Sequence, residues 1–194
     1  MSDLKKFDEW LVSDSVAAIV IREPLVPVEG PDGVFFPATY AAAEDKKVFP
    51  GGYNIDPPEG EINVCLVDSV GSQANRIEPL FGKPEYAKLV PQIIIQAGEN
   101  SVNLLEAGHR AGDAIVRCTT LQKRLQDAFK SVLRGNSFDL AKIAPTSLVF
   151  GVWDSRDTQA KLPRLVTSTI RAFDVKKLNR SAQFNPATDY IGLG

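Results

Sequence analysis

The 194-residue chain has little of what metal or thiol chemistry needs. It contains two cysteines, Cys65 and Cys118, and one histidine, His109. Each cysteine lies in an apolar run without a second Cys or His at metal-ligand spacing, so we expect no metal site and no cofactor. A single histidine also excludes a two-histidine metal site and a pair of histidines working as general acid and base.

Long apolar runs are missing as well. No stretch of about 18 apolar residues occurs, so no membrane-spanning helix is expected. The N-terminus is polar and lacks the apolar stretch of a signal peptide, which predicts a cytoplasmic protein without a membrane partner. A Gly-rich phosphate loop, a Ser-His-Asp order and an Asp-x-Asp cluster are also absent. We therefore expect a protein that is not an enzyme.

The charges are distributed unevenly along the chain. The net charge is −2, but residues 1–62 carry 5 Lys and Arg against 12 Asp and Glu, and residues 63–194 carry 17 against 12. This split predicts one surface for a polyanion and another for a basic neighbour. The alternative is an ordinary local imbalance on solvated surface.

Apolar periodicity predicts alternating helices and strands. Helices are expected at residues 3–12, 68 to about 81, 102–118 and 120–134, and strands at 15–21, 63–67, 92–96, 147–153 and 165–173. The pattern is typical of the α+β class with one layer of helices on a sheet, most commonly an RRM-like (ferredoxin-like) core. We expect a single domain over residues 1–194 with a long Pro/Gly-rich insertion at about 23–62, whose aromatic residues argue against plain disorder.

The helix that begins at Asp68 has one apolar and one polar face. Ser69, Ser72, Gln73 and Arg76 share the polar face and include no carboxylate. Hydroxyl, amide and guanidinium donors at a helix N-terminus suit phosphate and ribose contacts. The alternative is a solvated helix face.

His109 is expected on the helix at 102–118. Glu106–Arg110 and Asp113–Arg117 are expected as stabilising i,i+4 pairs on this helix. His109 would share a half-apolar stripe with Leu105, Gly112 and Val116, which favours a packed or hydrogen-bonded histidine over a general acid or base.

The segment from Gly151 to Arg180 is basic, with 7 Lys and Arg against 3 Asp and Glu. In the strand at 165–173, residues 167, 169, 171 and 173 place hydroxyls, a guanidinium and a ring on one face. A sheet that binds RNA needs such a face, with cations for phosphates and a flat surface for bases. The alternative is a half-exposed antiparallel strand.

Five blocks of sequence carry a family resemblance. They are residues 36–40 (FPATY), 67–76 (VDSVGSQANR), 108–115 (GHRAGDAI), 144–151 (APTSLVFG), and 153–156 (WDSR) with 161–164 (KLPR). In this order they resemble the RAMP-superfamily backbone subunit of type I-U (also called I-G) CRISPR effector complexes.

The resemblance implies an RRM-like core with helical and hairpin insertions. It also implies that copies polymerise along the CRISPR guide RNA, hold it for pairing with target DNA, and lack the cleavage activity of type III relatives. Members of this family continue past the position of Gly194, so we expect this chain to lack part of the core or of an RNA-clamping hairpin.

The partners expected from the resemblance are the guide RNA, target DNA through the guide, further copies of the chain and other subunits of the complex. An RNA-processing nuclease that uses His109 without a metal, and a protein-only scaffold, remain alternatives. The residues expected to bind RNA are Ser69, Ser72, Gln73, Asn75, Arg76, Arg110, Arg156, Lys161, Arg164, Arg171 and Arg180.

Overall fold

The computed structural model describes residues 4–56 and 61–178. The chain divides into two compact units, Met1–Phe36 and Pro37–Gly194, and the boundary falls inside the Pro/Gly-rich stretch. Each unit is considered by itself, and the organisation as one domain stays a prediction. Arg180, expected to bind RNA, lies outside the described residues.

In the described part of the first unit, residues 4–36, a short helical segment is followed by extended chain. A 3-10 helix at Leu4–Phe7 continues into α1 (Asp8–Val12), which confirms the helix expected at 3–12. The rings of Phe7 and Trp10 meet edge to face, with 5.1 Å between their centroids.

The buried strand expected at residues 15–21 is wrong. These residues form no strand, and Ile19, Val20 and Ile21 are 57%, 72% and 79% exposed. A β-prone sequence fits a pleated, half-buried surface, but it becomes a strand only where another strand supplies backbone partners. Among the described residues, no strand pairs with this segment.

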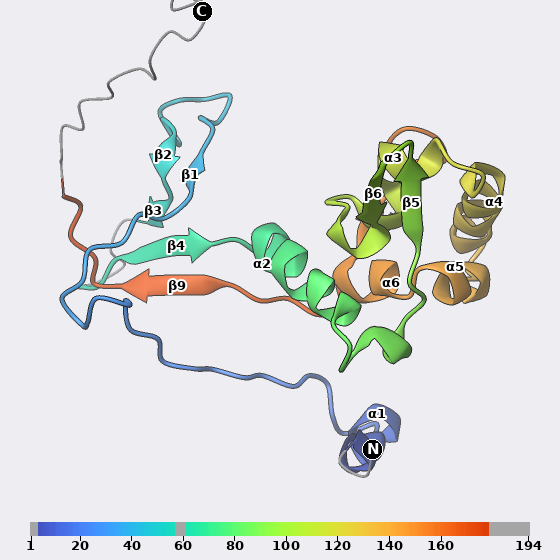
Figure 1. Ribbon diagram of the computed structural model, residues 1–194. Helices are drawn as coiled ribbons and strands as arrows, with labels where there is room; N and C mark the ends of the chain where they lie inside the picture. The colour runs from blue at the N-terminus through green and yellow to red at the C-terminus, as the bar shows by residue number, and fades with distance from the viewer. Residues whose placement is uncertain (1–3, 57–60, 179–194) are drawn as a thin grey trace, which may run out of the picture. The chain divides into compact units, whose positions relative to one another are not determined.

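The second unit contains a three-stranded antiparallel sheet in the order β3 (Ile55–Asp56), β4 (Val64–Asp68) and β9 (Ile170–Phe173). Figure 1 shows β9 beside β4, with α2 following β4 directly. β4 confirms the strand at 63–67, whereas only the last four residues of the strand expected at 165–173 pair with it. A separate hairpin joins β1 (Thr39–Tyr40) to β2 (Gly52–Tyr53).

The helix expected from residue 68 is present as α2 (Val70–Ile77) and continues into a 3-10 helix at Glu78–Gly82. Ser69 is the N-cap, and its hydroxyl accepts a hydrogen bond from the backbone N–H of Ser72 at 3.3 Å.

The hydrophobic core of the second unit lies among its helices. Leu125 and Phe129 of α4 (Gln122–Leu133) are completely buried with Val116 of α3 (Ala114–Arg117) and Leu140 of α5 (Phe138–Ile143). Further elements of this unit are β5 (Ile94–Ala97), β6 (Asn100–Asn103), α6 (Thr146–Phe150), β7 (Val152–Trp153) and β8 (Lys161–Leu162), with 3-10 helices at Ala87–Leu89, Leu104–Glu106 and Arg110–Gly112. β5 and α4 confirm the strand expected at 92–96 and the helix expected at 120–134.

The continuous helix expected at 102–118 is wrong. Its first residues pair with β5 as β6, and short helices follow. The backbone φ of Arg110 is +54°, a left-handed conformation that interrupts any right-handed helix. The chain bends here, so neither expected i,i+4 pair forms: Arg110 pairs with Glu78, and Arg117 with Asp154.

The strand expected at 147–153 is wrong over residues 147–150, which form α6. Pro145 precedes this helix with φ −58° and ψ −29°, and its fixed φ suits a helix start.

Helices combined with small antiparallel sheets confirm the α+β class, while the RRM-like core stays a prediction. None of the helices in the described part of the chain has the length and apolarity to cross a membrane.

Candidate nucleic-acid interface

The polar face of α2 is joined to the segment that leads into β9. Gln73 donates from Nε2 to the carboxylate of Asp68 and accepts from the Ser168 hydroxyl at 3.1 Å. Arg76 contacts the same carboxylate, with 3.3 Å between Nε and Oδ2, while its side chain is 73% exposed. Gln73 is therefore held in place by the fold, whereas most of the Arg76 side chain faces solvent.

Asp68 is the counter-charge of this face. Burial raises the pKa of its carboxyl group, but hydrogen bonds from Ser72 and Gln73 and the charge of Arg76 outweigh that effect and lower the pKa overall. Asp68 is thus ionised at neutral pH and orients both Gln73 and Arg76.

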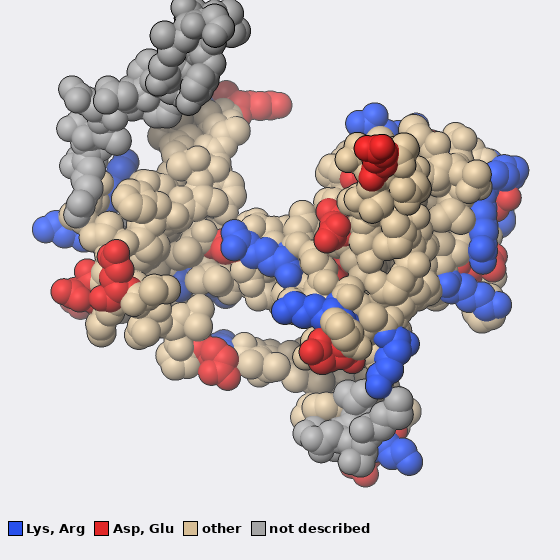
Figure 2. All heavy atoms as spheres, viewed as in Figure 1, with Lys and Arg blue, Asp and Glu red and all other residues tan. Residues whose placement is uncertain are grey.

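Arg164 lies beside the first turn of α2. Its Nη2 atom is 3.6 Å from the position that a Cβ atom on Gly71 would occupy. We define the α2 surface as Ser69, Ser72, Gln73, Arg76 and Arg164. Figure 2 shows Lys and Arg side chains extending over the surface at the position of α2.

Arg171 lies on β9, opposite Leu66 of β4. Arg171 and Phe173 are exposed, and Ile170 and Ala172 between them are half-buried. Over residues 170–173 this confirms the expected alternation, with a guanidinium and a ring on the same exposed face of the strand. Thr167 and Thr169 lie before β9, and Val166, expected on the apolar face, is 46% exposed.

Arg110 serves a different purpose from the one expected. It is 4% exposed, its Nε lies 2.5 Å from Oε2 of Glu78, and its Nη groups donate to the Gly151 carbonyl at 3.3 Å and to the Asn75 side chain at 3.2 Å. Burial raises the pKa of Glu78 and lowers that of Arg110. Arg110 therefore ties interior segments together and orients Asn75, which is itself exposed.

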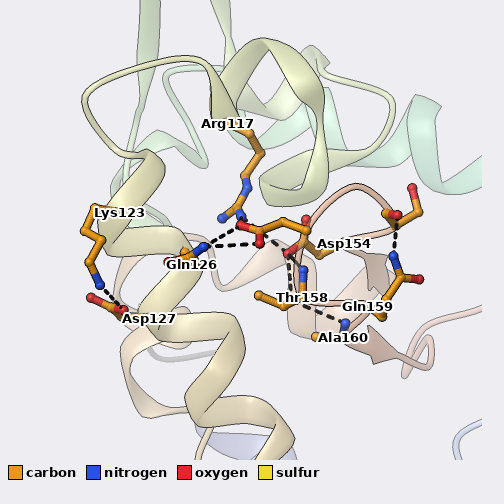
Figure 3. A network of polar contacts seen from close by, with 10 residues as sticks. Arg117, Lys123, Gln126, Asp127, Asp154, Thr158, Gln159 and Ala160 are labelled. Carbon is orange, nitrogen blue, oxygen red and sulfur yellow. Dashed lines mark hydrogen bonds and ion pairs between the residues drawn. The ribbon is translucent and has the colours of Figure 1, made fainter.

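The loop between β7 and β8 carries Arg156, and Lys161 is the first residue of β8; both are exposed. Its base is the completely buried Asp154, which accepts hydrogen bonds from the backbone N–H and hydroxyl of Thr158 at 3.0 and 2.7 Å. Arg117 lies 3.5 Å from the same carboxylate and also contacts Asp157 (Figure 3). The contacts of Asp154 and Arg117 therefore hold the loop in place.

Sequence reasoning missed this network because Asp154-Ser155-Arg156-Asp157 has the composition of a solvated charged loop. The available signal was Arg117, a charged residue between Val116 and Cys118 in an otherwise apolar run. A charged residue at an apolar position requires a partner.

His109 is exposed and precedes the 3-10 helix at Arg110–Gly112, so the half-apolar helical stripe expected for it does not exist. Its backbone N–H donates to the Asp113 carboxylate at 3.3 Å. Over residues 4–56 and 61–178, no three His, Cys, Asp or Glu residues are grouped so that they could hold a metal ion.

Comparison with protein families matches residues 19–177 to the model of a family described as CRISPR-associated protein GSU0053. No curated protein and no solved structure matches the chain.

Proposed function

Since the chain belongs to the CRISPR-associated protein GSU0053 family, we propose that it is the guide-RNA-binding backbone subunit of a type I-U (I-G) CRISPR effector complex. Membership of this family gives the chain a role in CRISPR-Cas defence, in an effector complex with other subunits. The finer role proposed here is to hold the guide RNA in the cytoplasm and present it for pairing with target DNA.

The α2 surface is the observation that supports this role best. Ser69, Ser72 and Arg164 lie at the first turn of α2, and Gln73 and Arg76 continue the same face to its last turn, so that hydroxyl, amide and guanidinium groups line one helix. Such groups contact phosphate and ribose oxygens in any sequence, and the N-terminus of α2 adds a favourable dipole.

Contacts of this kind suit a guide RNA whose sequence varies. A subunit that grips the sugar–phosphate backbone leaves the Watson–Crick edges of the bases free for a complementary strand. Arg171 and Phe173 on β9 extend the same chemistry to the sheet, with one cation and one exposed ring.

The test is incubation of the purified protein with labelled CRISPR repeat RNA, followed by separate assays of retention and cleavage. Retention without cleavage supports a backbone subunit. Cleavage that is lost in His109→Ala supports a metal-independent nuclease instead, and neither retention nor cleavage supports a protein-only scaffold.

Variants of the α2 surface make this test specific. Arg76→Ala with Arg164→Ala should weaken retention, because both guanidinium groups would contact phosphates. Arg134→Ala is the matched control, since Arg134 is an exposed arginine at the far end of α4 whose guanidinium bonds only the Ser131 hydroxyl among the interactions described. Equal losses in both proteins would argue against an α2 site.

A further inference from the structure

Trp153 is a large aromatic side chain that faces solvent from an otherwise buried stretch of chain. Its neighbours Val152 and Asp154 are 6% and 0% exposed, whereas Trp153 itself is 54% exposed. An exposed indole contributes less to the stability of the fold than a buried one, because much of its apolar surface stays in contact with water. The exposed part of the ring is therefore available to a ligand.

The backbone that carries Trp153 is fixed on both sides. Residues 153 and 161 are paired in the β7–β8 hairpin, and the next residue, Asp154, accepts from Thr158 and contacts Arg117 (Figure 3). On the other side the chain at Gly112 packs so closely that a Cβ atom there would come within 2.8 Å of the Trp153 carbonyl oxygen. The ring is thus presented by a rigid support and costs little conformational entropy to order.

One cation lies against the ring. The ammonium group of Lys161 on β8 is 5.6 Å from the centroid of the indole, and Arg156 is exposed in the loop between β7 and β8. The carboxylate of Asp157 in this loop contacts Arg117 and accepts a hydrogen bond from Gln126 of α4 at 3.1 Å. An exposed aromatic ring beside a cation combines the two elements that hold single-stranded nucleic acid, namely stacking for a base and charge for the flanking phosphates.

We propose that Trp153 is a stacking platform for one unpaired base of a single-stranded RNA, with Lys161 and Arg156 contacting the adjacent phosphates. This deepens the proposed function and rests on it, because it names a second contact on the same guide RNA. The base uses the face of the indole that Lys161 does not cover. A stacked base keeps its Watson–Crick edge free, so the platform has no sequence preference.

Fluorescence tests the platform directly, because the chain has only two tryptophans, Trp10 and Trp153. In a Trp10→Phe background, titration with a short oligoribonucleotide should quench the emission of Trp153. An abasic strand of the same length carries the phosphates without the bases, and it should bind without comparable quenching.

Affinity measurements separate the contribution of the Trp153 ring from that of the neighbouring cations. Trp153→Leu should weaken binding by about 5- to 150-fold, as expected for one stacked base, without changing the dependence on salt. Trp153→Phe should retain most of the affinity, and Lys161→Ala should reduce the salt slope by about 0.7. The matched control is Phe138→Ala, because Phe138 is 60% exposed and has the ammonium group of Lys142 4.1 Å from its ring centroid.

The outcomes distinguish this inference from the function on which it rests. If the protein retains RNA while Trp153→Leu binds as tightly as the wild type and Trp153 emission is unchanged, the platform is refuted and the backbone role stands. If the wild type retains no RNA, the proposed function fails and the platform fails with it. Circular dichroism of each variant shows whether a loss of binding reflects a loss of fold.

Discussion

Glu78 and Arg110 form a buried pair that links residues 32 positions apart. Their side chains are 1% and 5% exposed, and the carboxylate and guanidinium meet at 2.5 Å. Two charges this deeply buried are stable only while each satisfies the other, since desolvating either one alone is costly.

Glu78→Ala should therefore destabilise the protein by about 3–5 kcal/mol, because it leaves the Arg110 guanidinium buried without a counter-charge. The double variant Glu78→Leu with Arg110→Met should recover much of this loss, since it removes both charges and keeps apolar volume. Urea unfolding followed by circular dichroism measures both. A double variant less stable than the single one would contradict the interpretation.

Exposed residues should behave differently from this pair. His109→Ala should leave RNA retention mostly intact, because the histidine makes its described hydrogen bond through its backbone N–H. Arg76→Ala and Arg171→Ala should each weaken retention, with a salt slope smaller by about 0.7 for each lost phosphate contact. Filter binding at several salt concentrations gives the comparison. Should His109→Ala abolish a competent cleavage reaction while binding persists, the nuclease alternative would be favoured.

At the scale of elements, local pattern predicted those helices and strands whose environment matches their own periodicity. α4 has Leu125, Ala128 and Phe129 on one face, and that face is the one buried. The prediction of a helix at 102–118 was wrong because apolar periodicity does not reveal a single residue with positive φ, here Arg110. The strand at 15–21 failed because β-propensity does not supply a partner strand.

In the candidate site, too, local features could be predicted from the sequence and long-range contacts could not. The polar face of α2 and the alternation in β9 are local properties and could be predicted from spacing alone. Spacing does not show which charged residues form ion pairs inside the fold. Arg110 pairs with Glu78, which is 32 positions away, and Asp154 pairs with Arg117, which is 37 positions away. Apolar periodicity describes one helix or strand at a time, so it cannot predict ion pairs between residues far apart in the sequence.

The contact between the short helix at Arg110–Gly112 and β7 gives a prediction at this scale. Gly112→Ala should destabilise the protein by about 1–3 kcal/mol, because its Cβ would lie 2.8 Å from a backbone oxygen that cannot easily move. Gly71→Ala is the control: the atom nearest its Cβ is the flexible end of Arg164 at 3.6 Å, and alanine is the better helix former. Thermal unfolding ranks the two. Equal midpoints would contradict the close packing.

For the whole molecule, the charge split predicts assembly. Residues 1–62 have 5 cationic and 12 anionic side chains, and the remainder has 17 and 12, so successive copies could meet through opposite charges. A contact of this head-to-tail kind need not close into a ring.

We expect RNA-templated oligomers that lengthen with the RNA, because neighbours bound to one strand meet at high effective concentration. The aromatic stretch around Phe35–Tyr53 is our candidate for part of the contact; within it Phe36 is 76% exposed. Sedimentation with RNAs of increasing length measures the mass per strand. A constant single copy per RNA would show a monomeric RNA-binding protein instead.

Equilibrium binding as a function of salt tests whether this CRISPR-associated protein holds RNA through the sugar–phosphate backbone of the RNA. We expect the logarithm of the affinity to fall linearly with the logarithm of the salt concentration, with a slope of about −0.7 for every phosphate neutralised. We also expect equal affinities for scrambled RNAs of one length. A strong preference for one sequence, or binding that does not respond to salt, would contradict it.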